Sequence, residues 1–372
     1  MSIKYGIAAF GESTFLGFTQ NVDDHTVPNI VAGLPRDLTV KVENKAIAST
    51  TIDAQFQPIP GPLVPARIAE NRSPIAIVNF GINDAWQGTD VTAFRTKLAA
   101  VVDSIRRAGK RVFLQTPNAI AATHYADGTA LKNGISPVER LSEMAAAVNY
   151  VAGLYGLDCD GNGPRDIPLS DGIFHPTDAG YATAGTSLRN VVVSVGALAD
   201  ATYRVQAALI YIATLCRAPD VVGLNYWVTE LAAGRLSFDN GSLAAAFLAT
   251  PLVQTIYPDS ASNSQFVTAI YVNVLGRQPE QDGLTYWTTR LANGESRAMV
   301  ITEIVDTTYS YAENGGKLSY GLASQRLLLN RLSVGLAYGW IFAKTAYDTY
   351  PSGLFATVTD DPATVHPVTN TF

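Results

Sequence analysis

The sequence contains little cysteine, little charge and no excess of basic residues. The two cysteines among its 372 residues, Cys159 and Cys216, lie far apart, which argues against a disulfide framework. Charged residues make up 16% and hydrophobic residues 47% of the chain, the balance of a globular protein that buries sizeable cores and not of a disordered one. The net charge of −6 argues against bulk binding of nucleic acid, which requires a basic face.

Long apolar runs are also missing from the sequence. The most apolar windows, 207–216 and 327–343, are short or interrupted by polar residues, so we expect buried helices there and no membrane span. The first five residues run straight into an expected strand without a separate apolar segment and cleavage site. We therefore expect no cleavable signal peptide.

Residues 1 to about 200 alternate between strand-like and helix-like patterns. The expected strands are 5–10, 37–44, 75–80 and 111–115. The expected helices are 29–34, about 91–109, 137–155 and 178–198, with Thr89 or Asp90 as the cap of the second. Such an alternation is typical of an α/β fold with a parallel sheet.

Three loops expected at one edge of this sheet carry the residues that nucleophilic acyl transfer requires. Ser13 follows the first strand, Asn83 follows the buried strand at 75–80, and Asp171 and His175 precede the last helix. A serine attacks an ester only if a base removes its proton, an acceptor orients that base, and donors await the oxyanion. These four residues would fill those roles. Singly, each is more simply a helix cap, a turn residue or a structural histidine, so the prediction depends on their joint occurrence.

These blocks resemble those of the SGNH (GDSL-like) hydrolases over roughly residues 3–198. Gly-Glu-Ser at 11–13, Gly-Ile-Asn-Asp at 81–84 and His-Pro-Thr-Asp-Ala-Gly-Tyr at 175–181 follow the chain order of that family. The resemblance implies a flavodoxin-like three-layer sandwich with a parallel sheet, a shallow open site, and esterase or deacetylase activity on small acyl groups. It implies Ser13 as the nucleophile, His175 as the base, and the Ser13 N–H and the Asn83 side chain as oxyanion donors.

Three positions depart from the family pattern. Glu12 replaces the Asp before the nucleophile, which keeps the charge but lengthens the arm. Ser49 stands in the place of the second-block Gly, where its N–H can still donate to the oxyanion but a Cβ faces the site. Asp171 and His175 are four residues apart in the sequence, whereas the family has a spacing of three. A main-chain carbonyl is therefore the alternative acceptor for the His175 imidazole.

Two features near these blocks could bind a ligand. Trp86, just after the third block, is interpreted as a platform on which a sugar stacks, with a core aromatic as the alternative. Residues 158–163 copy the opening of an EF-hand calcium loop, but Leu169 occupies the twelfth position, where calcium needs a bidentate Glu. A Gly-rich loop is favoured there over weak calcium binding, and we predict no metal and no cofactor.

From about Tyr203 the pattern becomes helical, and an internal repeat with an offset of 60 residues appears: the stretch 209–227 recurs at 269–287. In each copy Arg-x-Pro-acid-x-x-Gly should end one helix and start the next, and the Tyr-Trp pair that follows should pack inward. For Arg217 and Arg277 we expect a structural salt bridge to the acid three residues on. The repeat resembles a helical domain of unknown function that is common in large secreted bacterial proteins.

The sequence therefore predicts an SGNH-type hydrolase domain at 1–200, an all-α attachment or assembly domain at 201–345, and a polar, mobile tail at 346–372. The expected function is a serine esterase that removes O-acetyl groups from a carbohydrate or polysaccharide, with the helical domain attached to a polysaccharide or cell surface. An extracellular location without a cleavable signal is expected, and a cytoplasmic or virion-associated location is the alternative. Two other functions stay open: a catalytically weak SGNH domain that acts as a carbohydrate-binding module, and a structural surface or virion protein.

Overall fold

The computed structural model of the chain divides into two compact units. It describes residues 6–12, 41–44, 46, 49–55, 68, 71–118, 135–160, 175–194, 196–312, 314–345 and 353–372. One unit lies between Lys4 and Leu198, and the other consists of Ala199–Phe372 with Arg107–Lys110. None of the described helices combines the length and the apolarity that a membrane span requires.

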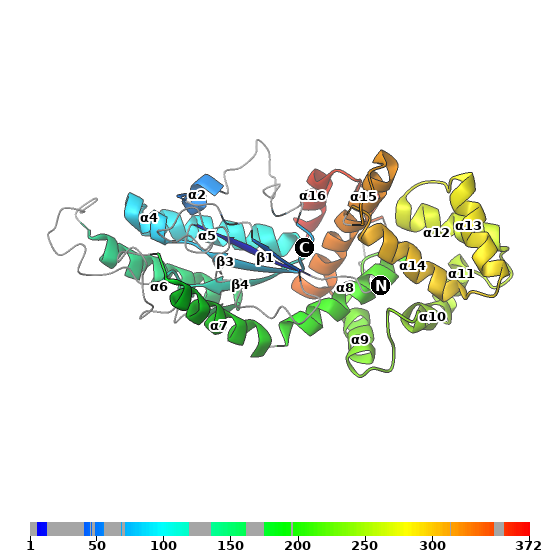
Figure 1. Ribbon diagram of the computed structural model, residues 1–372, viewed down its shortest axis with the longest axis horizontal. Coiled ribbons are helices and arrows are strands. Elements are labelled where there is room, and N and C mark those ends of the chain that lie inside the picture. The colour runs from blue at the N-terminus through cyan, green and yellow to red at the C-terminus, as the bar shows by residue number, and fades with distance from the viewer. Residues whose placement is uncertain are drawn as a thin grey trace. The chain divides into compact units, whose positions relative to one another are not determined.

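The first unit contains a five-stranded parallel sheet, within the described residues, in the order β2-β1-β3-β4-β5 (Figure 1). Its strands are β1 (Gly6–Gly11), β2 (Lys41–Asn44), β3 (Ile75–Asn79), β4 (Arg111–Gln115) and β5 (Asp158–Asp160). This order is that of flavodoxin-like folds. The predicted α/β class with a parallel sheet is confirmed; the expected helix at 29–34 and the start of the strand at 37–44 lie outside the described residues.

The two central strands of the sheet are apolar along most of their length. The side chains from Ile7 to Phe10 in β1 and from Ile75 to Val78 in β3 are at most 1% exposed. Continuous apolar runs of this kind are typical of parallel strands that are covered on both faces.

The helices of this unit are α2 (Ile52–Gln55), α4 (Ile82–Gln87), α5 (Val91–Arg107), α6 (Pro137–Tyr155) and α7 (Asp178–Ser194). Right-handed crossovers from β3 to β4 and from β4 to β5 place α5 and α6 on the same face of the sheet. Their contacts agree with this placement, because Tyr155 Oη donates to Ala99 O at 3.2 Å and Arg106 Nη1 donates to Tyr155 O at 3.0 Å.

Most helix boundaries follow from local capping chemistry. Asp90 caps α5 by accepting a hydrogen bond from Ala93 N at 2.9 Å, and Ser136 caps α6 by accepting from Glu139 N at 3.1 Å. The predicted helix at 178–198 is wrong at its end, because α7 stops at Ser194 and a new helix starts after Gly196. The φ angle of Gly196 is +60°, a left-handed conformation that ends helices.

The second unit is helical. Its elements are α8 (Ala197–Leu215), α9 (Val221–Ala232), α10 (Ser242–Leu248), α11 (Pro251–Ile256), α12 (Asn263–Ile270), η3 (Tyr271–Leu275), α13 (Gln281–Ala292), α14 (Arg297–Tyr309), α15 (Ser319–Leu336), η4 (Ala337–Ile341), η5 (Pro362–Thr364) and α16 (Val365–Thr369). Helix α14 packs against both α10 and α15, and α12 packs against α13 (Figure 1). The predicted helical character of the C-terminal region is therefore confirmed.

The repeated motif has the same close contact in both copies. A Cβ built on Gly223 would lie 2.0 Å from the Tyr211 hydroxyl oxygen, and one on Gly283 would lie 2.5 Å from that of Tyr271. Real Cβ atoms do not approach another atom so closely. The glycine of Arg-x-Pro-acid-x-x-Gly is thus required by the tyrosine of the preceding helix.

Other predictions about the repeat are confirmed only in part. Arg277 pairs with Glu280 at 2.8 Å, as expected for the acid three residues on. Of each aromatic pair, the tryptophan is the more buried residue: Trp287 is 9% exposed, but Tyr226 and Tyr286 are 57% and 54% exposed. The prediction that the tyrosines pack inward is wrong, because consecutive helical residues point in directions about 100° apart.

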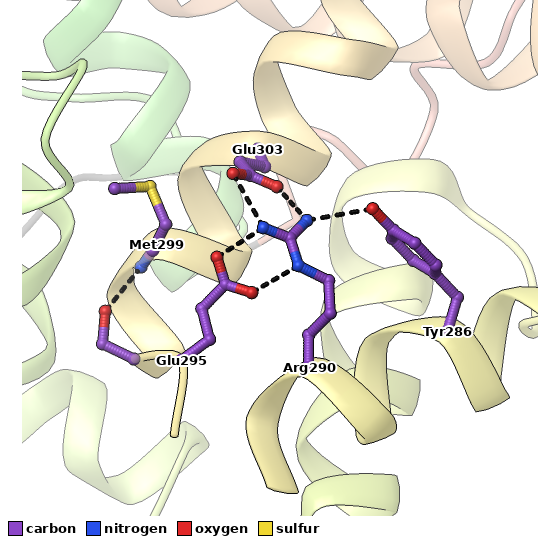
Figure 2. Close-up of polar contacts among 6 residues, drawn as sticks. Tyr286, Arg290, Glu295, Met299 and Glu303 are labelled. Carbon is purple, nitrogen blue, oxygen red and sulfur yellow. Dashed lines mark hydrogen bonds and ion pairs between the residues drawn. The ribbon is translucent and has the colours of Figure 1, made fainter. Parts of the chain in front are cut away.

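A polar network joins α13 to the start of α14 (Figure 2). The Arg290 guanidinium pairs with the carboxylates of Glu295 and Glu303, and its Nη1 donates to Tyr286 Oη at 3.1 Å. Ser296 caps α14 by accepting from Met299 N at 3.1 Å. The two carboxylates hold the pKa of Arg290 above its ordinary value. The network fixes the short connection between the two helices.

Part of the segment predicted as a mobile polar tail is folded. Residues 353–372 contain η5 and α16, which pack against α15. The buried apolar side chains described in this segment are Leu354, Phe355, Val358, Val365 and Val368. These apolar residues are interspersed with threonines and aspartates, so the composition of the segment is polar and led to the wrong prediction. Their burial makes the segment part of the helical unit.

Candidate active site

The candidate site lies where the strand order reverses. From the two central strands, the chain continues outward to β2 on one side and through β4 to β5 on the other, and Gly11 is paired with Asn79 at the ends of β1 and β3. Ligand crevices of open parallel sheets occur at the carboxyl ends of the strands, at such a reversal. The described residues that follow these two ends are Glu12 and the segment Phe80–Gln87.

Glu12 connects the two strand ends. Its side chain is fully buried, and its two carboxylate oxygens accept hydrogen bonds from the backbone N–H groups of Ile82 and Asn83, each at 2.7 Å. Burial raises the pKa of Glu12 to about 8, and the carboxylate of Asp84 adds to this rise, while the two N–H groups oppose it. The residue next to the predicted nucleophile is thus bound directly to the first turn of α4.

Asn83 lies in that first turn and is held through both its backbone and its side chain. Its N–H donates to Glu12, and its Nδ2 donates to Thr50 O at 3.1 Å. An amide nitrogen carries two hydrogens, and no described residue accepts the second one. Asn83 therefore retains a side-chain donor at the carboxyl ends of the central strands.

Asp84 attaches the same turn to the segment after β2. Its Oδ2 accepts a hydrogen bond from Ile52 N at 3.2 Å, while its Oδ1 is buried without a hydrogen-bond partner among the described residues. Burial raises the pKa of Asp84 to about 6. Together with the Asn83 bond to Thr50, this contact fixes the position of residues 50–52 relative to α4.

Ser49 precedes this attached segment and has a φ angle of +58°. That conformation belongs to the left-handed region, which favours glycine. The backbone at Ser49 thus has a conformation that glycine adopts without strain, and the role of the Ser49 N–H as an oxyanion donor stays a prediction. Its side chain is exposed.

His175 lies two residues before the cap of α7. Thr177 provides that cap, because its Oγ1 accepts from Gly180 N at 3.2 Å and its carbonyl accepts from Tyr181 N at 2.8 Å. Tyr181 is fully buried, which anchors the first turn of α7 in the core. The His175 side chain is half-buried.

The remaining predicted residues divide into described and undescribed positions. Ser13 and Asp171 lie outside the described residues, so the nucleophile and the triad acid stay predictions. Trp86 is 40% exposed on α4. It lies three residues after Asn83, and residues three apart share a face of a helix. The interpretation of Trp86 as a buried core aromatic is therefore wrong.

A second polar group, which sequence reasoning missed, crosses the sheet at the last residues of β3, β4 and β5. Asn79 Nδ2 donates to Gln115 Oε1 at 3.1 Å, and Gln115 Nε2 donates to Asp160 Oδ2 at 3.0 Å. Thr116 adds bonds to Asp160 O from its N at 3.2 Å and from its Oγ1 at 3.1 Å. All of these side chains are buried. The signal in the sequence was a polar residue at the end of the apolar strands β3 and β4; the short β5, Asp-Cys-Asp, gave no such signal.

The two described acids of the calcium-like segment already have partners on the neighbouring strand β4. Asp158 pairs with Arg111 at 2.9 Å, and Asp160 accepts from Gln115. Among the described residues, no group of His, Cys, Asp and Glu side chains is arranged to hold a metal ion. Residues 161–170, which contain the rest of the calcium-like segment, lie outside the described ranges.

Comparison with known proteins places the two parts of the chain separately. Residues 9–183 match the model of the GDSL-like Lipase/Acylhydrolase family, and residues 244–312 match a domain of unknown function (DUF4214). No curated protein sequence matches the chain.

Solved structures also resemble part of the chain. A carbohydrate acetylesterase from Sinorhizobium meliloti is 14% identical, with 52% of this chain and 100% of that chain covered and a TM-score of 0.42. An aryl esterase from M. smegmatis is 17% identical, with 51% and 99% covered and a TM-score of 0.41. A lipase/acylhydrolase from Enterococcus faecalis is 19% identical, with 51% and 96% covered and a TM-score of 0.40.

Proposed function

Residues 9–183 belong to the GDSL-like lipase/acylhydrolase family, and from this premise we propose that the chain is a serine esterase that removes O-acetyl groups from a carbohydrate. Family membership supports ester hydrolysis; the acetyl group and the carbohydrate are the proposal.

In the proposed reaction, Ser13 Oγ attacks the ester carbonyl carbon while His175 takes its proton. The oxyanion accepts hydrogen bonds from Asn83 Nδ2 and from the N–H groups of Ser13 and Ser49. The C–O bond to the sugar then breaks, and the sugar oxygen receives the proton from His175. A water molecule attacks the acetyl-Ser13 in the same manner and releases acetate. Asp171, or a main-chain carbonyl, orients the imidazole.

The observation that carries this proposal is the arrangement of Asn83. The N–H groups of Ile82 and Asn83 are both occupied by Glu12, so the first turn of α4 offers the Asn83 side chain as its donor. One Nδ2 hydrogen is bound to Thr50 O, which limits the directions of the other. A donor fixed before the reaction is what electrostatic stabilisation of an oxyanion requires.

Two features support a small acyl group on a sugar. The sequence between the blocks contains no long apolar segment that could line an acyl tunnel. The exposed Trp86 lies on the same helix as Asn83, and aromatic rings stack on the apolar faces of sugars.

The helical unit is proposed to attach the enzyme to an extracellular polysaccharide. Tyr226 and Tyr286 occupy equivalent positions of the repeat. Each is more than half exposed, and its ring forms a T-shaped contact with the neighbouring tryptophan. The full chain that carries Ser13→Ala should be retained on an insoluble polysaccharide. Adding Tyr226→Ala and Tyr286→Ala together to this chain should lower its retention. Tyr150→Ala, which removes a similarly exposed tyrosine from α6, is the matched control.

Hydrolysis of p-nitrophenyl acetate tests the chemistry. Ser13→Ala and His175→Ala should each lower kcat by about 10³-fold or more, because nucleophile and base act as a unit. His366→Ala, a histidine outside the blocks, should leave kcat unchanged. A kcat equal to that of the wild type in either site variant contradicts the mechanism.

Acetate release from an acetylated xylan tests the substrate. Release that depends on Ser13 supports the proposal. Turnover of p-nitrophenyl acetate without release from acetylated polysaccharides contradicts the carbohydrate substrate. Retention on the polysaccharide with no turnover of either ester would identify the chain as a binding module.

A further inference from the structure

Helix α4 begins without a cap from its own segment. Its N-cap residue is Gly81, which makes no side-chain cap hydrogen bond. The φ angle of Gly81 is +132°, and a Cβ there would lie 3.2 Å from both Met144 Cβ and Pro117 Cγ. A serine, aspartate or asparagine, the usual capping residues, is therefore excluded at this position.

The carboxylate of Glu12, at the end of β1, takes the place of the missing N-cap. Glu12 extends from the end of β1 and accepts the N–H groups of Ile82 and Asn83, the first two residues of α4, at 2.7 Å each. These groups have no partner within a helix, and the Glu12 side chain is fully buried. Without the carboxylate, the buried N–H of Ile82 and the part-buried N–H of Asn83 would lose their acceptor.

The same carboxylate determines where the Asn83 side chain points. The backbone of Asn83 is held by Glu12 from one side, and its Nδ2 is held by Thr50 O from the other. If the Glu12 bond is lost, the first turn of α4 can rotate about the remaining contact. The free hydrogen of the Asn83 amide would then be misaligned.

We propose that Glu12 is a positioning residue of the esterase: its carboxylate caps α4 from β1 and thereby aims the Asn83 amide at the oxyanion of the reacting ester. This inference rests on the proposed function. Glu12 itself touches no reacting atom; it acts through Asn83.

The charge of Glu12 is part of this arrangement. An ionised carboxylate accepts both N–H groups, whereas a protonated one uses an oxygen as a donor. Burial raises the pKa of Glu12 to about 8, with a further contribution from Asp84, the charged group that acts on it within the described part of the chain. Kinetic measurements at about pH 9 therefore compare variants with the ionised form.

Steady-state kinetics with p-nitrophenyl acetate tests the role. Glu12→Gln keeps the shape of the side chain but turns an NH₂ donor toward one of the two N–H groups. We expect kcat to fall about 10- to 100-fold with KM nearly unchanged, somewhat less than the loss of a whole oxyanion donor. Glu12→Asp keeps the charge and should retain more activity than Glu12→Gln. Glu43→Gln, the same change at an acid of β2 that accepts from Asn71 at 2.8 Å, is the control.

A double-mutant cycle with Asn83→Ala separates positioning through Asn83 from a general effect. In the Asn83→Ala background, Glu12→Gln should lower kcat no further, because the group that Glu12 aims is gone. An equal loss in both backgrounds overturns the proposal, and so does wild-type kcat in Glu12→Gln.

An NMR titration of the wild-type chain tests the contact without any variant and without turnover. The amide proton resonances of Ile82 and Asn83 should move upfield together as the pH falls from about 9 to about 6, because protonation weakens both bonds. Resonances that do not respond overturn the inference. If the wild type hydrolyses no ester while these resonances titrate, the proposed function fails and the cap stands; if it hydrolyses ester and they do not titrate, the reverse holds.

Discussion

The contact between Tyr271 and Gly283 makes a quantitative prediction about stability. Gly283 is the third residue of α13, where alanine would ordinarily stabilise the helix by ~1 kcal/mol relative to glycine. A Cβ there would lie 2.5 Å from Tyr271 Oη, and the tyrosine ring is only 6% exposed, so it cannot swing into solvent. Overpacking of this kind costs about 1–3 kcal/mol. Gly283→Ala should therefore be destabilising despite its better helix propensity.

Removal of the hydroxyl should reverse the sign of this effect. In a Tyr271→Phe background, the neighbours that remain near the new Cβ are Glu280 Oε2 at 3.2 Å, the far end of a flexible side chain, and ring Cζ at 3.4 Å, an ordinary contact. Gly283→Ala should then stabilise by up to ~1 kcal/mol. Urea unfolding followed through tryptophan fluorescence gives the four free energies of this cycle, and Trp287 lies beside the contact on α13. A Gly283→Ala variant that stabilises the chain with Tyr271 present would refute the reasoning.

Three further predictions concern strain, protonation and substrate size. Ser49→Gly should raise the free energy of unfolding by ~1 kcal/mol, because φ is +58° at that residue; thermal unfolding measures it. The folded chain binds the Glu12 proton more tightly than the unfolded chain, since its pKa rises from 4.5 to about 8. The free energy of unfolding should thus decrease as the pH rises through that interval, and Glu12→Gln should remove this part of the slope in urea titrations. Acetyl esters should have a higher kcat/KM than octanoyl esters, because an open crevice gains little of the ~0.8 kcal/mol available per buried methylene; a steady increase with chain length contradicts an open site.

Four of the five strands and the major helices could be predicted from the sequence because their signals are local. Strand β5 was missed, and residues 158–160 were expected in a loop, because its sequence Asp-Cys-Asp contains no apolar run. Apolar runs predicted β3 and β4. Pro137 marked the start of α6, and Gly156 marked its end. The end of α7 was missed because residues on both sides of Gly196 have helical patterns, and one glycine does not always end a helix. The C-terminal segment was misjudged because composition averages over five separate apolar residues.

In the candidate site, the sequence predicts only those residues whose type and surrounding motif indicate a chemical role. Asn83 and His175 stand in recognisable blocks, so the sequence predicted roles for them. The partners of Asn83 could not be identified in this way, since Glu12 and Thr50 are distant in the chain and one of them acts through a backbone carbonyl. Long-range bonds to main-chain atoms leave no residue-type signal in a single sequence.

The hydrogen bonds between the side chains at the ends of β3, β4 and β5 all run in the same direction: each amide nitrogen donates toward β5. Asp160 carries only acceptors when ionised, so Gln115 must turn its nitrogen toward it and its oxygen toward Asn79. Asn79 must then present its nitrogen, and its own oxygen is left buried without a partner among the described residues. One carboxylate at the edge of the sheet therefore sets the orientation of the Gln115 amide, and the Thr116 carbonyl, which accepts from Asn79 Nδ2 at 3.3 Å, adds a second preference for the same orientation of Asn79. An asparagine at position 160 would remove the first preference but not the second, so Gln115 could invert only by turning its nitrogen toward the nitrogen of Asn79.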